Sequence, residues 1–337
     1  MRAVVIEGPG DFRVDTAPDP SPAPDEVIVE VGACGICGTD LHIIDGEFPP
    51  TTYPIIPGHE FAGRIVAAGS EVTELAEGTR VAVDPSLFCG HCDYCRIARG
   101  NLCRNWGAIG DTVNGAFAEY VAVPAANAYL LPDDFDLRYG AMVEPLSCAV
   151  HGINMMGDLL GRRCLVIGAG TMGLLIGQLL RHAGATEVAL VDRNKDRLAI
   201  TETLGLGPTA SDARELPSPG FDVAVDATGV PRAIEAAFDA LGRGGILLVF
   251  GVAAAGDKIA LSPFRIYNDE IRIIGSMAVL HSFGTARDLL TARAIDVAPL
   301  LSDPYPMYHF ADAVESVRTG SGVGTKVQVS PKAVTSG

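Results

Sequence analysis

A short apolar run, a glycine-rich turn and an amphipathic run follow one another between residues 164 and 182, and this order constrains the fold more than any other feature. The run Cys164-Leu165-Val166-Ile167 predicts a buried strand, and residues 172–182 predict a helix. Glycines in the turn between them allow a tight bend and close approach of the backbone to a pyrophosphate, while the helix N-terminus favours negative charge. We therefore predict a dinucleotide site at Gly168, Gly170, Thr171, Met172 and Gly173.

An acidic residue closes the next predicted strand and indicates which dinucleotide binds. Asp192 follows the apolar run 188–191 and lies 19 residues after Gly173. A carboxylate at this place can accept both hydroxyls of the adenosine ribose and repels a 2′-phosphate, which favours NAD over NADP. Arg193 keeps the alternative open, because it could pair with a 2′-phosphate if Asp192 turned away. Thr228 follows another apolar strand, at the sheet edge where a cofactor is expected.

The alternation of strands and helices continues along the second half of the chain. Apolar runs at 188–191, 223–225, 246–250 and 271–274 predict an α/β domain with a parallel, doubly wound sheet. From Met1 to about Tyr129, short alternating runs separated by glycine and proline predict a mainly antiparallel β-domain instead. A strand-like run at 326–329 predicts that the tail returns to this first domain. We expect domains at 1–147 and 148–287, and a returning segment at 288–337.

Four cysteines gather in a lobe at about residues 86–105. Cys89, Cys92, Cys95 and Cys103 have the spacing C-x2-C-x2-C-x7-C. Four thiolates can close around one Zn²⁺ with no position left for a substrate, so this site is predicted to be structural. An iron–sulfur cluster and unrelated free thiols are the alternatives. His91 is interpreted as a solvated loop residue.

A second set of metal-ligand residues is scattered along the first domain. It comprises Cys37 in a glycine-rich turn, the pair His59-Glu60, and Glu144 before a proline. One thiolate, one imidazole and one carboxylate with a vacant position suit a catalytic zinc. Each residue taken alone has an ordinary structural explanation, as a buried thiol, a turn residue or an acid at a helix N-terminus.

Taken together, these blocks resemble the zinc-containing medium-chain dehydrogenases over nearly the whole chain. The matching segments are 35–42, 58–60, 144–146, the cysteine lobe and the glycine-rich turn. The resemblance implies a GroES-like catalytic domain at 1–147 and a Rossmann domain that binds NAD. It also implies that Cys37, His59 and Glu144 surround a catalytic zinc, with Glu60 able to exchange with Glu144. Glu144-Pro145-Leu146 is similar to the branch that contains polyol (sorbitol) and threonine dehydrogenases.

The resemblance also assigns roles in proton and cofactor handling. Thr39 is expected to accept the alcohol proton and pass it by way of the cofactor ribose to His42 and solvent. Arg197 matches a basic position that contacts the adenosine ribose, with an exposed helix charge as the alternative. Thr228 has a counterpart that lines the cofactor site.

The expected reaction is hydride transfer from a secondary alcohol, such as a polyol, sugar alcohol, cyclitol or diol, to NAD, which gives a ketone. The resemblance places residues near Ile43, Trp106, Glu144 and the segment 275–281 at the substrate. Polyol members often carry an Arg-Tyr pair where this chain has Ala278-Val279, so simple secondary alcohols remain an alternative. L-threonine 3-dehydrogenase is the nearest other enzyme, and a non-catalytic nucleotide- and zinc-binding protein is the other class of function.

Composition limits the partners. The formal charge of −16 argues against nucleic acid and anionic membranes as partners. The N-terminal run is interrupted by Glu7 and Gly8-Pro9 before a signal-peptide core could form, and the clustered cysteines suit a reducing compartment. We therefore expect a cytoplasmic enzyme. Relatives with a carboxylate in place of the second ligand cysteine are often tetramers, so a homotetramer is expected.

Overall fold

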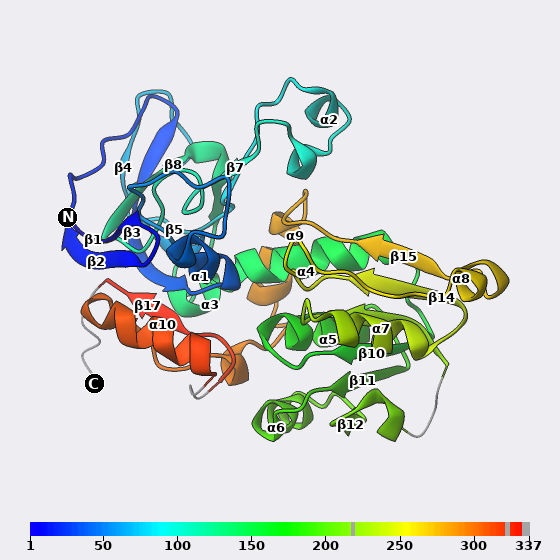
Figure 1. The fold of residues 1–337 in the computed structure, drawn as a ribbon. Helices are drawn as coiled ribbons and strands as arrows, with labels where there is room; N and C mark the ends of the chain where they lie inside the picture. The colour runs from blue at the N-terminus through cyan, green and yellow to red at the C-terminus, as the bar shows by residue number, and fades with distance from the viewer. Residues whose placement is uncertain (217–219, 321–323, 332–337) are drawn as a thin grey trace. The chain divides into compact units, whose positions relative to one another are not determined.

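The computed structural model describes residues 1–216, 220–320 and 324–331, and the chain divides into two compact units (Figure 1). Unit 1 comprises Met1–Ser147, Val279–Arg293 and Leu301–Gly337. Unit 2 comprises Cys148–Ala278 and Ala294–Leu300. Within the described residues, no helix combines the length and apolar sequence needed to cross a membrane.

Unit 1 is built on a seven-stranded sheet in the order β16-β17-β3-β4-β5-β9, with β8 also paired to β3. All of these pairs are antiparallel except β16 with β17. The alternating valines Val27, Val29 and Val31 of β3 are buried in its core, as their spacing predicts. The strands are β3 (Glu26–Gly35), β4 (Glu60–Ala68), β5 (Arg80–Val83), β8 (Tyr120–Pro124), β9 (Ala128–Leu130), β16 (Tyr305–Pro306) and β17 (Gln328–Ser330).

Two small sheets and short helices complete unit 1. β1 (Arg2–Gly8) pairs with β2 (Asp11–Thr16), and β6 (Ser86–Leu87) pairs with β7 (Gly107–Ala108) at the base of the cysteine lobe. The helices are α1 (Gly38–Asp45), α2 (Asp93–Arg96), α3 (Leu137–Gly140), α9 (Phe283–Thr291) and α10 (Phe310–Thr319).

Unit 2 contains a six-stranded parallel sheet in the order β12-β11-β10-β13-β14-β15. The strand order reverses at β10, which places the first strand at the centre, as in a doubly wound fold. This confirms the predicted fold class. The strands are β10 (Arg163–Ile167), β11 (Glu187–Val191), β12 (Thr209–Ala210), β13 (Phe221–Asp226), β14 (Leu241–Val249) and β15 (Arg272–Gly275).

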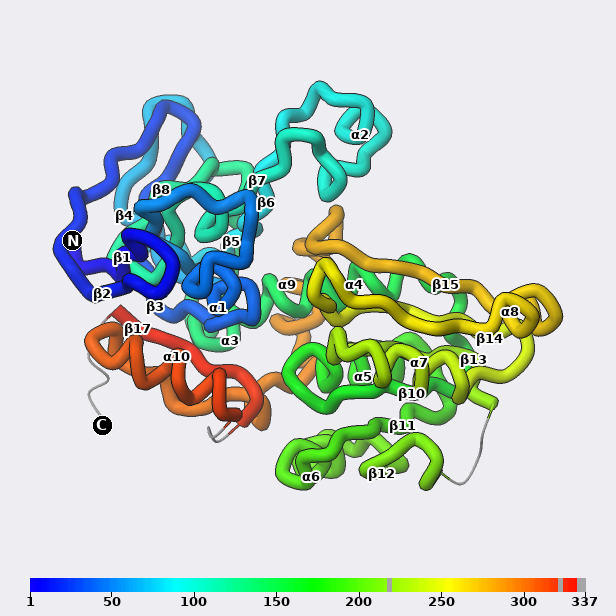
Figure 2. The backbone as a smooth tube through the Cα atoms, in the orientation of Figure 1, coloured from blue at the N-terminus to red at the C-terminus, as the bar shows by residue number. Residues whose placement is uncertain are grey.

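Helices cover both faces of this sheet (Figure 2). On one face, Ile234 and Phe238 of α7 (Pro231–Asp239) share a core with Leu165 of β10. On the other face, Gly177 of α5 (Thr171–His182) lies against Leu190, and a Cβ there would be 3.6 Å from it. The remaining helices are α4 (Val143–Met156), which begins in unit 1, α6 (Lys195–Thr203) and α8 (Pro263–Asn268).

The chain crosses between the two units at four positions. It passes from unit 1 to unit 2 between Ser147 and Cys148 and returns between Ala278 and Val279, and it enters unit 2 again for Ala294–Leu300. The expected end of the second domain at residue 287 lies inside α9, which belongs wholly to unit 1. Phe283 of α9 packs on Tyr129 of β9, with 4.8 Å between ring centroids.

Candidate functional site

The four cysteines of the lobe converge on one point. The Sγ atoms of Cys89, Cys92, Cys95 and Cys103 all lie within 4.8 Å of one another. Three of the separations are 3.5 Å for Cys89–Cys103, 3.6 Å for Cys92–Cys95 and 3.9 Å for Cys92–Cys103. Sulfurs at about 2.3 Å from one tetrahedral zinc stand about 3.8 Å apart, so the lobe has the dimensions of a Cys₄ zinc site. A disulfide needs about 2.05 Å, and all four thiols are free.

Backbone amides of the lobe favour the thiolate of Cys92, whereas burial raises the pKa of the Cys95 thiol. The N–H groups of Cys89 and Asn105 donate to Cys103 Sγ at 3.4 and 3.3 Å. The N–H groups of Arg104 and Cys95 lower the pKa of Cys92 to about 6. His91 is exposed, with Nδ1 2.7 Å from the carbonyl oxygen of Cys89, and it is not part of the ligand group among the described residues.

A second group of ligand atoms lies in unit 1, where Cys37, His59 and Glu60 come within 4.8 Å of one another. Cys37 is the N-cap of α1, and its backbone N–H donates to Asp40 Oδ2 at 2.7 Å. Glu60 begins β4 directly opposite Gly35 of β3. A Cβ on Gly35 would lie 2.2 Å from Glu60 Oε2, so the glycine leaves the space that the carboxylate occupies. A thiolate, an imidazole and a carboxylate at this separation fit a zinc ion.

Two buried carboxylates lie beside Nδ1 of His59. Nδ1 lies 3.0 Å from Asp111 Oδ1 and 3.7 Å from Asp40 Oδ1. Burial raises the pKa of Asp40 to about 7, although His59 opposes this. Burial lowers the pKa of His59, but Asp111 and Asp40 outweigh it and raise the value well above the ordinary one. A carboxylate at Nδ1 orients a histidine whose Nε2 binds metal, which is the arrangement that supports ligand histidines in metal sites.

Lys326 also belongs to this site, although no motif in the sequence indicates it. Its Nζ donates to Glu60 Oε1 at 2.7 Å, to Glu60 Oε2 at 2.6 Å and to the carbonyl oxygen of Ile36 at 3.2 Å. Both side chains are buried, with 6% and 2% of their surface exposed. Burial lowers the pKa of Lys326, but Glu60 and Cys37 outweigh that effect and raise it. The ammonium therefore fixes Glu60 beside the other ligand residues.

The remaining predicted residues of this site lie at different distances from the ligand group. Thr39 Oγ1 is 3.8 Å from Cys37 Sγ. His42 is half-exposed on α1, with Nδ1 3.0 Å from Glu47 Oε2. Glu144 is buried in the first turn of α4 but is outside the group of ligand atoms within 4.8 Å among the described residues.

The residues expected at the substrate differ in accessibility. Ile43 of α1 is fully buried and belongs to the hydrophobic core of unit 1. Val279 is also buried. Trp106 is partly exposed, but its indole nitrogen is buried and has no hydrogen-bond partner in the described part of the chain.

The glycine-rich turn of unit 2 has the predicted conformation at the carboxyl end of β10. Gly168 has a φ of +103° and lies against Thr228, and a Cβ on Gly173 would lie 1.7 Å from the Gly168 carbonyl oxygen. A Cβ on Gly170 would meet only Arg197 Nη1, at 3.9 Å. Gly170 is the N-cap of α5 and has no side chain with which to cap the helix. Backbone N–H groups at a helix N-terminus of this kind suit a pyrophosphate.

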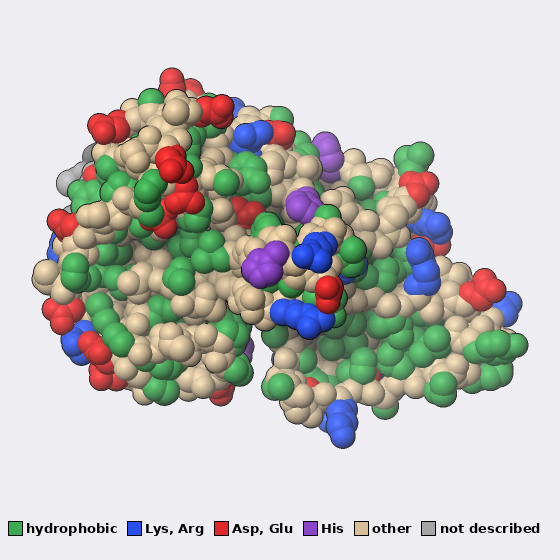
Figure 3. Space-filling model, turned by 90° about the horizontal axis from the view of Figure 1, so that it is seen from above, with side chains coloured by type: hydrophobic (Ala, Val, Ile, Leu, Met, Phe, Trp, Pro, Cys, Tyr) green, Lys and Arg blue, Asp and Glu red, His purple; other side chains and the backbone are tan. Residues whose placement is uncertain are grey.

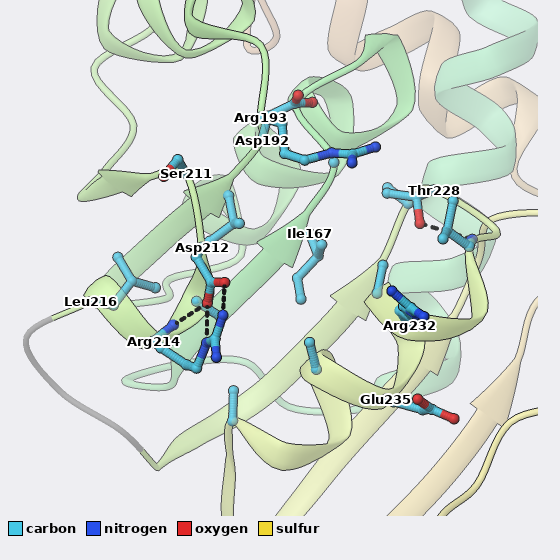
Figure 4. A pocket seen from close by; sticks show the side chains of 18 of the residues that line it. Ile167, Asp192, Arg193, Ser211, Asp212, Arg214, Leu216, Thr228, Arg232 and Glu235 are labelled. Carbon is cyan, nitrogen blue, oxygen red and sulfur yellow. Dashed lines mark hydrogen bonds and ion pairs between the residues drawn. The ribbon is translucent and has the colours of Figure 1, made fainter.

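A cavity of about 1170 Å³ extends from this turn along the carboxyl ends of the strands (Figure 4). Gly168, Gly170, Asp192, Arg193, Arg197 and Thr228 line it. Asp192 is anchored by the backbone N–H groups of Ala169 and Asn194, each at 2.8 Å. Thr228 donates its hydroxyl to Asp226 Oδ1 at 2.6 Å. Thr171 and Met172 begin α5 but are not among the residues that line this cavity.

Comparisons with known proteins agree with both parts of the site. The family model described as an alcohol dehydrogenase GroES-like domain matches residues 23–133, and the one described as a zinc-binding dehydrogenase matches residues 171–292. D-arabinitol dehydrogenase 1 of Uromyces fabae is 36% identical over 94% of each chain. L-threonine 3-dehydrogenase of Saccharopolyspora erythraea is 32% identical over 95% of this chain and 96% of its own.

A solved structure agrees over the same length. A protein from Sinorhizobium meliloti 1021, assigned as a zinc-binding dehydrogenase and bound to NADP, superposes with a TM-score of 0.94 at 36% identity, covering 98% of this chain and 99% of its own. The chain is thus an oxidoreductase acting on the CH–OH group of its donors. It belongs to the zinc-dependent medium-chain alcohol dehydrogenase family, in the branch of the polyol and threonine dehydrogenases.

Proposed function

We propose that this protein oxidises the secondary hydroxyl group of a polyol, sugar alcohol, cyclitol or diol to a ketone, with NAD as hydride acceptor. The observation that carries the proposal is the convergence of Cys37, His59 and Glu60 within 4.8 Å in unit 1. The similarity to a D-arabinitol dehydrogenase supports a polyol as substrate. The carboxylate of Asp192, at the end of β11 in unit 2, supports NAD.

We propose that Cys37, His59 and Glu60 hold the catalytic zinc, with Glu144 as the carboxylate that can exchange with Glu60. Zinc supplies a Lewis acid that lowers the pKa of the alcohol hydroxyl. Lys326 positions Glu60 through two short hydrogen bonds, and Asp111 and Asp40 orient the ring of His59.

Two further residues handle the proton. The Thr39 hydroxyl, next to Cys37 Sγ, accepts the alcohol proton at Oγ1 and passes its own hydroxyl proton on toward His42 and solvent. His42 is half-exposed and paired with Glu47, so its imidazole can exchange a proton with solvent.

In unit 2, we propose that the backbone at Gly168, Gly170 and Gly173, with Thr171 and Met172 at the start of α5, holds the pyrophosphate. Asp192 accepts the ribose hydroxyls, assisted by Arg197, whose Nη1 lies 3.7 Å from the carboxylate. Arg193 and Thr228 line the same cavity. In unit 1, Cys89, Cys92, Cys95 and Cys103 hold the structural zinc.

The assay is a panel of candidate alcohols with NAD, followed by the absorbance of the reduced nicotinamide. The panel contains sorbitol, xylitol, D-arabinitol, butane-2,3-diol, a cyclitol and L-threonine. We expect turnover of at least one polyol or diol, its loss in Cys37→Ala, and its retention in Cys164→Ala, a buried cysteine of β10. Turnover of L-threonine alone would favour threonine dehydrogenase, and absence of turnover with every alcohol would refute the proposal.

We also propose that the protein is a cytoplasmic homotetramer that binds neither nucleic acid nor membranes. β15 is an edge strand of the unit 2 sheet, and Ile273 and Met277 on or beside it are 43% and 42% exposed. An apolar strand edge of this kind is suited to pairing with a second copy. On the face drawn in Figure 3, basic side chains form no continuous surface, in keeping with the net charge of −16. Light scattering should give four times the 35.1 kDa of one chain, and a monomer mass would refute the oligomer.

A further inference from the structure

Asp111 lies closer to the ring of His59 than the other buried carboxylate does. Its Oδ1 is 3.0 Å from Nδ1, against 3.7 Å for Oδ1 of Asp40. Neither Nδ1 nor Oδ1 of Asp111 has a hydrogen bond to any third residue in the described part of the chain. Oδ2 of Asp40 accepts the N–H of Cys37 at 2.7 Å, at the N-cap of α1. Asp40 therefore also serves the backbone of α1, whereas Oδ1 of Asp111 serves the ring.

The turn that carries Asp111 is hydrogen-bonded to β7, the strand at the base of the cysteine lobe. The carbonyl oxygen of Ala108, the last residue of β7, accepts the N–H of Asp111 at 3.1 Å and that of Thr112 at 2.9 Å. The Thr112 hydroxyl accepts the N–H of Ala108 at 3.0 Å and donates to its carbonyl oxygen at 3.2 Å. The position of Asp111 therefore follows that of β7.

The same turn packs closely on the segment that carries His59. Gly110 has a φ of +90°, and a Cβ there would lie 2.3 Å from the carbonyl oxygen of Gly58. The hydroxyl of Thr51 donates to the carbonyl oxygen of Asp111 at 2.6 Å. The turn thus connects β7 on one side with the residue before His59 on the other.

The lobe beyond β7 has little packing of its own. It extends from β7 to α2 (Figure 1), and none of residues 88–99 is buried, with Ile97 68% and Phe88 52% exposed. A segment that buries so little apolar surface cannot offset the entropy of its own ordering, so metal bound by the four cysteines supplies the folding energy. β7 pairs with β6 over two residue pairs, in a sheet of their own. Loosening of the lobe should therefore reach β7.

We propose that Asp111 is a positioning residue that couples the two metal sites of unit 1, so that metal in the cysteine lobe raises the metal affinity of Cys37, His59 and Glu60 (the mixed-ligand group). The inference rests on the proposed zinc ligands. A carboxylate at Nδ1 fixes a ligand histidine and strengthens its other nitrogen as a donor, and losing it typically costs about 10–100-fold in metal affinity. The coupling is reciprocal, so metal in the mixed-ligand group should strengthen the lobe by the same factor.

Cadmium-loaded protein allows both affinities to be measured in one sample. Four sulfur ligands and a mixed set of ligands give separate resonances in cadmium NMR, and titration with a chelator then gives the affinity of each site. Cys37→Ala should remove the mixed-ligand resonance and so assign it. In Asp111→Asn that resonance should shift, because the carboxylate changes the donor strength of the imidazole. Asp84→Asn, which removes the charge of an acid just before β6, is the matched control and should leave it in place.

A double-mutant cycle tests the coupling. Cys95→Ser, which weakens the lobe, should lower the affinity of the mixed-ligand group about tenfold. Asp111→Asn alone should lower it about tenfold, and adding Cys95→Ser to Asp111→Asn should change it less than about threefold further. Thr112→Val keeps every metal ligand and removes the side-chain bonds to Ala108, so it carries the test if Cys95→Ser does not fold. It should lower the affinity of the mixed-ligand group at least about threefold in the parent and have no further effect in Asp111→Asn.

Three results would overturn the inference and leave the alcohol dehydrogenase proposal intact. The first is an unchanged affinity of the mixed-ligand group in both Cys95→Ser and Thr112→Val. The second is a loss from these substitutions that is as large in Asp111→Asn as in the parent, since the lobe would then act by another route. The third is an effect of Asp84→Asn as large as that of Asp111→Asn. If the parent protein gives only the four-sulfur resonance, the proposed catalytic ligands fail together with the inference.

Discussion

Replacing Lys326 by methionine tests whether the buried ion pair with Glu60 holds the metal-ligand group together. The substitution removes all three hydrogen bonds of Nζ, to both oxygens of Glu60 and to the carbonyl oxygen of Ile36. It leaves the carboxylate of Glu60 without its cation at a position where 2% of the side chain is exposed. Breaking a buried pair from one side costs about 3–5 kcal/mol of the free energy of unfolding.

The loss of unfolding free energy caused by Lys326→Met should depend on whether zinc is bound. Zinc held by Cys37, His59 and Glu60 would supply positive charge to Glu60, so we expect the lower end of that range in zinc-loaded protein and the upper end after chelation. Urea unfolding followed by circular dichroism measures both. Lys258→Met, which changes an exposed lysine, is the matched control and should stay within about 0.5 kcal/mol of the parent protein.

A double variant separates lost charge from lost packing. Lys326→Met combined with Glu60→Gln removes both charges at nearly constant volume, so it should recover most of the loss. A cost below about 1 kcal/mol for Lys326→Met, or a double variant less stable than the single one, would refute the reasoning.

Three further predictions concern the glycine-rich turn, the proton path and a buried acid. Gly173→Ala should sharply lower the melting temperature and abolish nucleotide binding, because its Cβ would lie 1.7 Å from the Gly168 carbonyl oxygen. Gly170→Ala should leave the melting temperature unchanged, and equal effects of the two substitutions would contradict this prediction. Thr39→Val should lower kcat at least about a hundredfold, whereas Thr39→Ser should keep kcat within about tenfold of the parent value. Similar kcat values in the two variants would exclude the hydroxyl from proton transfer. Burial raises the pKa of Asp84, so the carboxyl binds its proton more tightly in the folded than in the unfolded protein. As the pH rises above the pKa of Asp84 in the unfolded chain, ionising the buried carboxyl therefore lowers the free energy of unfolding. In urea unfolding, the stability of Asp84→Asn relative to the parent should therefore increase as the pH rises above about 4, and a difference that shrinks with rising pH would contradict the sign.

The features that the sequence predicts well are local. The glycine-rich turn and the four-cysteine lobe each lie within about 20 residues, and their chemistry depends on spacing that can be read directly. The parallel sheet follows from the repeated apolar runs for the same reason. These parts of the fold have the predicted form.

The features that the sequence does not predict depend on tertiary pairing. Lys326 meets Glu60 across 266 residues because β17 pairs with β3, and nothing in the local sequence marks that lysine as buried. Asp111 reaches His59 from a loop outside any ligand motif. Ile43 follows the motif that contains Thr39 and His42, but the side of α1 on which it lies is decided by packing in the core. The four-cysteine lobe follows from its spacing, and Cys37, His59 and Glu60 were expected from the resemblance, whereas no sequence pattern indicated the groups that contact His59 and Glu60.

The central claim is that one zinc ion is held by Cys37, His59 and Glu60. Anomalous diffraction at the zinc edge, from crystals of the protein purified without chelator, tests it most directly. The account predicts two peaks in each chain, one among Cys37, His59 and Glu60 and one among the four cysteines of the lobe. A lobe peak with no peak among Cys37, His59 and Glu60 would contradict it.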